Sequence, residues 1–172
     1  MAKEYGGQNR RFLADVMLKN ICRWLRIAGI DAMYPDCEED SEIIAMAEKT
    51  GRILLSMDRE MIFRAKKRQI QSFLVPKGDA EEQLNSIFLN YSLATHFPDF
   101  TRCPACNSSL SLKKRSELVK EQLRAIPPNT RKTSRDFWIC SKCGKIYWRG
   151  GHWKRISKMM EGLKSTSSKG KT

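Results

Sequence analysis

Apolar residues in the first hundred positions follow two alternating patterns, one with the period of a helix and one typical of short buried strands. Four short, largely apolar runs predict β-strands at 11–15, 31–35, 52–56 and 70–76. Each run is followed by a segment with helical spacing of its apolar residues, at 17–29, 41–50, 59–68 and 79–94. A strand–helix order repeated four times predicts an α/β domain with a mostly parallel sheet flanked by helices.

The first predicted helix carries two stripes. Its apolar stripe has the i, i+3, i+4, i+7 spacing of a buried face and includes Cys22, which we therefore assign to the core. Lys19, Arg23 and Arg26 form a basic stripe beside it. Such a stripe is ordinarily a solvated face. Because this one follows directly on Asp15, we also consider it a candidate set of phosphate contacts.

Composition changes near residue 100. Residues 1–100 carry 14 basic and 15 acidic side chains, whereas residues 101–172 carry 18 basic and 4 acidic ones, and the whole chain has a net charge of +13. A basic module beside a near-neutral one indicates a polyanionic partner, with solubility as the ordinary alternative. We predict a flexible leader at 1–10, an α/β domain at 11–98, a second module at 99–157 and a disordered basic tail at 158–172.

Hydrophobic residues make up 41% of the chain, enough for a packed core, but no apolar run reaches the roughly 18 residues that span a membrane. The first charged residues are not followed by the apolar segment of a secretory signal. We therefore expect no membrane partner and a cytoplasmic location, with the nucleus as the alternative.

Two C-x-x-C pairs stand in the basic module, CPAC (103–106) and CSKC (140–143). Two such pairs can present four thiolates to one ion, so we predict a closed structural zinc site in a zinc ribbon, with the ligands Cys103, Cys106, Cys140 and Cys143. Asn107 and Gly144, one after each pair, suit the tight turns that such knuckles need. The 33 residues between the pairs exceed the usual gap and indicate a basic insertion, which contains Lys113, Lys114 and Arg115 and a short helix ended by Pro127 and Pro128.

Three aspartates follow predicted strands. Asp15 ends the first strand, Asp40 lies in the loop after the second, and Asp58 lies just past the third. Because ligands of parallel α/β sheets bind at the carboxyl ends of the strands, we expect all three at one edge of the sheet. Clustered carboxylates persist together mainly when a cation neutralises them, and oxygen ligands suit Mg²⁺ or Mn²⁺, the ions of metal-dependent nucleases.

An aspartate before a helix is also a favoured N-cap, and capping is the alternative role for each of these three. Spacing does not choose a fourth acid among the neighbouring Asp36, Glu38, Glu39 and Glu42. We expect His96 to be structural.

Aromatic and basic residues alternate after the second cysteine pair. Such residues can stack on bases and contact phosphates, although small zinc modules also use aromatics as their core. We expect Trp138 and Tyr147 to be structural, and we assign nucleic-acid contacts to Arg149, His152, Trp153, Lys154 and Arg155.

Several segments are familiar in combination: FLADVMLKNICRWLRIAGIDAMY, GRILLSMD, CPACNSSL and CSKCGKIYWRGGH. Together they resemble the Mut-seven C-terminal ribonuclease domain family, a PIN-like domain followed by a zinc ribbon, over residues 11–156. The resemblance implies a metal-dependent ribonuclease in which Asp15, Asp40 and Asp58 bind the metal and the four cysteines of the C-x-x-C pairs bind zinc. The family often has Thr-Arg-Asp where this chain has Ser56-Met57-Asp58, so one positive charge beside the site is absent.

Our first hypothesis is an RNA endonuclease with Mg²⁺ or Mn²⁺ at the acids, acting on rRNA, tRNA or a ribonucleoprotein, with the zinc ribbon and its insertion binding the RNA. The second is an RNA- or ribosome-binding adaptor whose PIN-like domain is weak or inactive. The third is a DNA-directed nuclease, because phosphate contacts do not distinguish the two sugars.

Overall fold

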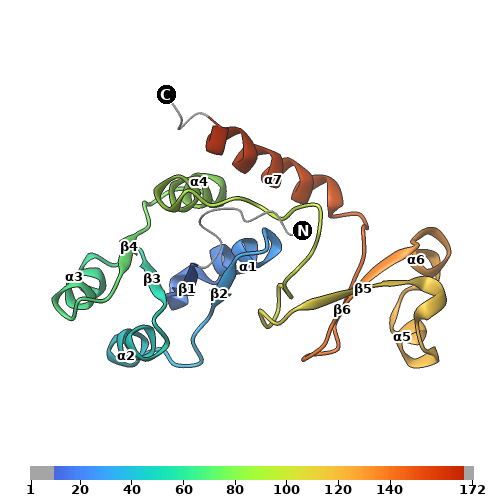
Figure 1. Ribbon diagram of the computed structural model, residues 1–172, viewed down its shortest axis with the longest axis horizontal. Helices are drawn as coiled ribbons and strands as arrows, with labels where there is room; N and C mark the ends of the chain where they lie inside the picture. The colour runs from blue at the N-terminus through green and yellow to red at the C-terminus, as the bar shows by residue number, and fades with distance from the viewer. Residues whose placement is uncertain (1–9, 169–172) are drawn as a thin grey trace, which may run out of the picture.

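A computed structural model describes residues 10–168 and contains two separate sheets (Figure 1). The first sheet is wholly parallel, has the strand order β2-β1-β3-β4, and consists of β1 (Arg11–Ala14), β2 (Asp31–Met33), β3 (Ile53–Ser56) and β4 (Ser72–Leu74). The second is antiparallel, in the order β5-β6-β7, with β5 (Leu110–Lys114), β6 (Asp136–Cys140) and β7 (Ile146–Tyr147). The predicted α/β fold with a parallel sheet and a zinc ribbon is confirmed.

The helices of the first domain are α1 (Lys19–Ile27), preceded by the short η1 (Val16–Leu18), then α2 (Asp40–Thr50), α3 (Arg59–Lys67) and α4 (Ala80–Tyr91). Strand residues alternate between two cores: Phe12 and Leu55 belong to the core shared with α1 and α4, whereas Leu13 and Leu54 belong to the core shared with α2 and α3. Both faces of the sheet are therefore buried, as the apolar runs predict. Cys22 lies in the first core, as predicted, and burial raises its pKa to about 11.

The insertion between the cysteine pairs forms η2 (Arg115–Glu117), α5 (Lys120–Ala125) and α6 (Pro128–Thr133), at the end of the molecule opposite α3 (Figure 1). Only one short helix was expected there. The helix α5 does end before the two prolines, but Pro128 is the first residue of α6, the position at which a missing N–H costs nothing. Leu118, Ile126, Phe137 and Ile139 form a small core beneath these helices.

The prediction of a disordered tail at 158–172 is wrong for residues 158–168, which belong to α7 (Trp153–Ser168). This helix lies along α4 (Figure 1), and Met160 and Leu163 are fully buried in the first core. Ile156, Met160 and Leu163 recur at helical spacing, so the tail does have an apolar face. Burial of this face offsets the conformational entropy that the chain loses on folding. Residues 169–172 lie outside the described part of the chain.

The predicted leader also falls outside the described residues, except for Arg10. The Arg10 guanidinium donates a 2.8 Å hydrogen bond to the Tyr91 carbonyl and lies over the Tyr91 ring. Within residues 10–168, no helix is both long and apolar enough to cross a membrane. The domain boundaries predicted above stay predictions.

A buried polar bridge joins the first zinc knuckle to the parallel sheet. The Arg26 guanidinium donates to the Ala32 carbonyl (2.7 Å) of β2 and to the carbonyls of Pro104 (3.2 Å) and Ala105 (2.9 Å) inside the knuckle. Arg26 is only 7% exposed. Its assignment as an RNA contact is therefore wrong: the side chain turns inward because three backbone acceptors there need a donor.

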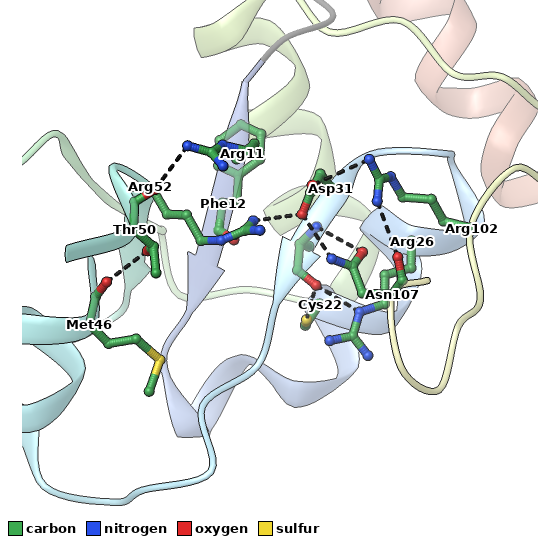
Figure 2. A network of polar contacts seen from close by, with 11 residues as sticks. Arg11, Phe12, Cys22, Arg26, Asp31, Met46, Thr50, Arg52, Arg102 and Asn107 are labelled. Carbon is green, nitrogen blue, oxygen red and sulfur yellow. Dashed lines mark hydrogen bonds and ion pairs between the residues drawn. The ribbon is translucent and has the colours of Figure 1, made fainter. Parts of the chain in front are cut away.

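Asp31 is the second centre of this bridge (Figure 2). Its carboxylate accepts hydrogen bonds from Arg52 (2.6 Å) and from the Asn107 amide (2.8 Å), and it forms an ion pair with Arg102 (3.3 Å). Burial alone would raise the pKa of Asp31, but these partners outweigh it and lower the pKa below its ordinary value. The Asn107 side-chain oxygen in turn accepts from the Ala32 N–H (3.2 Å), so the bridge reaches both elements through part-buried polar groups.

We expect Arg26→Met to lower the free energy of unfolding by about 2–3 kcal/mol, because several buried carbonyls lose their donor. Arg23→Met is the matched control, since the Arg23 side chain is exposed on the same helix, and we expect its effect to stay within about 0.5 kcal/mol. Urea unfolding followed by tryptophan fluorescence measures both. Equal effects of the two substitutions would show that the bridge does not carry this stability.

Candidate functional site

The acidic edge begins at Asp15, which directly follows β1. The Asp15 side chain is 3% exposed, and its N–H donates to the Leu55 carbonyl of β3 (2.9 Å). Its carboxylate accepts a 2.7 Å hydrogen bond from the Ser56 hydroxyl at the end of β3. The parallel pairing of β1 with β3 therefore places Asp15 beside the residues that lead to Asp58.

Asp58 is linked to Asp15 through the same serine. The Asp58 N–H donates to the Ser56 hydroxyl oxygen (2.9 Å), and Asp58 Oδ1 accepts from the Glu60 N–H (2.7 Å) at the start of α3. Asp58 is thus the N-cap of α3, and the capping alternative is correct for this residue. The recorded hydrogen bonds of Asp15 use Oδ2 and those of Asp58 use Oδ1, so one oxygen of each carboxylate is not engaged by them.

Asp40 is placed differently. It is the first residue of α2, whose N-cap is Glu39, and it forms a 3.3 Å ion pair with Arg64 of α3. Both side chains are about two-fifths exposed. Arg64 therefore supplies a positive charge at the acidic edge that the sequence pattern did not reveal.

The three aspartates do not form a preassembled metal cage. Within residues 10–168, the only three or more Asp, Glu, His or Cys side chains with ligand atoms all within 4.8 Å of one another are the four zinc-knuckle cysteines. The structure therefore brings Asp15 and Asp58 together through Ser56 and leaves Asp40 with Arg64.

The four knuckle cysteines converge as predicted. Cys103 and Cys143 have their sulfurs 3.7 Å apart, and Cys106 and Cys140 have theirs 3.4 Å apart. A tetrahedral ion with metal–sulfur bonds of about 2.3 Å holds its sulfurs about 3.8 Å apart, so the four thiols fit one metal ion.

The turns that follow the two knuckles have the expected geometry. Asn107 (φ 68°) and Gly144 (φ 69°) both adopt the left-handed conformation that the sequence predicts at these positions. Tyr147 closes one side of the cluster with its hydroxyl 3.1 Å from the Cys103 sulfur, which agrees with its predicted structural role.

The chemistry of the thiols also favours a cation. Burial opposes ionisation of Cys106, but hydrogen bonds from Ser108 and from neighbouring thiols outweigh it and lower its pKa to about 6. At Cys143 a backbone hydrogen bond from Lys145 favours the thiolate, yet burial and the other three thiols raise its pKa to about 12. The cluster therefore resists becoming fully anionic unless a bound metal ion neutralises it.

The residues assigned to RNA lie in three places. Lys19 and Arg23 are exposed on α1, and His152, Lys154 and Arg155 are exposed at the start of α7. In the insertion, Lys114 forms a 2.7 Å ion pair with Asp136, Arg115 donates to the Arg131 carbonyl, and Lys113 is half-buried.

Trp153 was assigned to base stacking, and that assignment is wrong. Its ring stacks on Phe97 at 5.0 Å between centroids, meets Phe100 edge-on at 5.6 Å, and lies under the Arg149 guanidinium at 4.9 Å. These contacts occupy the ring inside the protein, where it joins α7 to the first core. Trp138 is buried in the same core, as predicted.

The predicted site residues do not include four residues that lie near these sites. Ser56 had a signal, because a small polar residue ends an otherwise apolar run, and it is fully buried. Arg64 had none, since its partner Asp40 lies 24 positions away. Lys142 and Lys145 flank the second knuckle and line a cleft between the knuckles and α1.

Comparison with known proteins agrees with this arrangement. Residues 10–160 match the Mut7-C RNAse domain family. Over 117 residues, 64% of this chain, the sequence is 28% identical to the Homo sapiens protein named exonuclease mut-7 homolog. The matched region is 13% of that protein, so the chain spans only a small part of the length of this relative. No solved structure matches the chain.

We expect the purified chain to bind one metal ion, and Cys106→Ser to lose most of it during dialysis against a weak chelator, because three thiolates hold the ion less tightly than four. Cys37→Ser is the control, since Cys37 lies outside the four-cysteine cluster. Elemental analysis by mass spectrometry gives both the identity of the metal and its ratio to protein. Equal metal content in the two variants would contradict the assignment of the ligands.

Proposed function

The chain belongs to the Mut7-C RNAse domain family, and from this premise we propose that it is a metal-dependent ribonuclease that cuts RNA endonucleolytically. The observation that carries the proposal is the link in which Ser56 joins the Asp15 carboxylate to the backbone N–H of Asp58, at the carboxyl edge of a parallel sheet. Ligands of open parallel sheets bind at this edge.

Asp15 and Asp58 suit a hard divalent ion, because both are carboxylates and each has one oxygen outside the recorded hydrogen bonds. We propose that these two residues hold Mg²⁺ or Mn²⁺, with Asp40 as a third ligand once Arg64 is displaced. Such an ion would activate the attacking water and neutralise charge that develops on the phosphate.

The chain's own residues have distinct roles in this proposal. Ser56 donates a hydrogen bond to the Asp15 carboxylate and accepts one from the Asp58 N–H, so it orients the Asp15 side chain and holds the backbone of Asp58 next to it. The cap of α3 fixes the Asp58 side chain further. Arg64, which pairs with Asp40 in the structure, would contact the scissile phosphate after it leaves Asp40.

The four-cysteine site is proposed to hold zinc, which closed sites of this composition favour. Its ribbon and insertion, with α1 of the first domain, would bind RNA through salt-sensitive phosphate contacts. The exposed residues proposed for these contacts are Lys19 and Arg23 of α1 and, after residue 100, Lys114, Arg115, Arg149, His152, Lys154 and Arg155, together with the half-buried Lys113. Ribosomal RNA, transfer RNA and ribonucleoproteins stay predictions as targets, as does a cytoplasmic location.

Endonucleolytic cutting is proposed because two of the three acids are accessible, although Asp15 itself is buried. Asp58 is exposed, and the Asp40 side chain is 42% exposed. An internal stretch of a strand can approach such an edge without threading an end through it. The human relative is named an exonuclease, so the two modes of cutting need a direct test.

An RNA- or ribosome-binding adaptor is the second candidate. The Asp40–Arg64 ion pair favours it, because the positive charge of Arg64 can neutralise Asp40 in place of a bound metal ion.

We expect wild-type protein with Mn²⁺ or Mg²⁺ to cut a circular single-stranded RNA, which has no ends for an exonuclease, and Asp58→Asn to lower the rate by at least about 100-fold. The Asn side chain still caps α3, so the fold is retained. Asp79→Asn is the matched control, because Asp79 caps α4 in the same way, and it should cut at the wild-type rate. Reaction products are resolved on denaturing gels.

Cutting of linear RNA with the circle left intact would contradict the endonuclease proposal. Binding of RNA without cutting in wild type and Asp58→Asn alike would overturn the nuclease proposal and favour the adaptor. A circular DNA of the same sequence, cut as fast as the RNA, would show a nuclease that does not select the sugar.

A further inference from the structure

A cleft of about 910 Å³ lies between α1 and the two zinc knuckles. One wall is formed by Lys19, Asn20 and Arg23 of α1, and the other by Lys142 and Lys145 around the second knuckle. The backbone of Pro104 and Ala105, held by Arg26, also lines the cleft. The polar bridge therefore sets how far the two walls stand from each other.

The cleft is strongly basic. Lys19, Arg23, Lys142 and Lys145 are all exposed, and no aspartate or glutamate is among the residues that line it. Four thiolates around a divalent metal carry net negative charge, so Lys142 and Lys145 also have an ordinary role in balancing it. That role does not account for Lys19 and Arg23, which come from a different element and have no carboxylate partner in the cleft.

One end of the cleft borders the acidic edge. The Tyr34 hydroxyl donates a 3.0 Å hydrogen bond to the carbonyl of Val16, the residue after Asp15. The Lys19 ammonium lies over the Tyr34 ring, 5.6 Å from its centroid. Tyr34 and Lys19 both line the cleft, so a chain leaving it at this end arrives beside Asp15.

We propose that this cleft binds the sugar–phosphate backbone of single-stranded RNA and leads the strand from the zinc knuckles toward Asp15. The proposal rests on the proposed ribonuclease function and adds a binding track with Lys142 and Lys145 as contacts. Cations on two facing walls clasp one backbone from both sides, as in grooves for single strands. The volume is within the usual range of ligand pockets, about 300–1,000 Å³, which suits a few nucleotides of a single strand.

The test measures binding without cutting. Every variant carries Asp58→Asn, and fluorescence anisotropy follows a labelled oligouridine, which forms no duplex, over a range of salt concentrations. The cleft variant is Arg23→Gln with Lys145→Gln, one cation from each wall. The control variant is Lys49→Gln with Lys66→Gln, which removes the same charge from exposed positions outside the cleft.

We expect the cleft variant to bind about tenfold more weakly at physiological salt, with its log–log salt slope reduced by about 1.4, because a single strand releases about 0.7 counterion for each lost phosphate contact. The control should bind as the Asp58→Asn parent does. Metal content is measured in each protein to show that the zinc knuckles are intact.

Equal binding by the cleft and control variants would overturn the proposal. So would a double-stranded RNA that binds as tightly as oligouridine and loses as much affinity in the cleft variant. Failure of the nuclease proposal is seen separately, as absence of cutting by the wild-type protein, and that result leaves the measured RNA binding of the cleft unaffected.

Discussion

A largely buried polar bridge joins the two modules, beside an apolar contact in which Trp138 of the ribbon packs into the first core. Arg26 satisfies carbonyls on both sides of the junction, and Asp31 gathers Arg52, Arg102 and Asn107 around one carboxylate. Removing a single partner would leave buried acceptors or an unpaired charge, which costs far more than an exposed ion pair contributes. The bridge therefore holds the first knuckle against the parallel sheet. The helix α7 adds an apolar contact with α4, in which Met160 and Leu163 are buried.

This rigid junction has a consequence for charge. The excess positive charge of the chain lies in its second part, while Asp15 and Asp58, linked through Ser56, stand at the edge of the first sheet. Because the bridge fixes the knuckles beside α1, cations from both parts face a common cleft. An anionic substrate that is attracted to the basic surface is thereby brought close to the aspartates, which would otherwise repel it. Arg64 at the acidic edge reduces that repulsion further.

The local pattern of apolar residues was enough to predict much of the fold. Alternating apolar runs and helical stripes predict the parallel sheet, and the tight turns predicted after the cysteine pairs are the left-handed turns at Asn107 and Gly144. Arg26 could not be told from Arg23, since both belong to one basic stripe and the deciding acceptors lie 78 and 79 positions away. The ion pair of Arg64 with Asp40 could not be predicted either, because the two residues are 24 positions apart in the sequence. In α7, by contrast, the helical spacing of apolar residues was present in the sequence. The many small, polar and basic residues of this segment obscured that spacing.

The central claim is that Asp15 and Asp58 form a metal site at the edge of the sheet, with RNA reaching it past α1. The most direct measurement is a crystal structure of the full chain soaked with Mn²⁺, with anomalous diffraction collected at the manganese absorption edge. The account predicts an anomalous peak in contact with oxygens of Asp15 and Asp58, with Arg64 turned away from Asp40. A structure with no manganese at these carboxylates, and with the Asp40–Arg64 pair intact at saturating Mn²⁺, would contradict it.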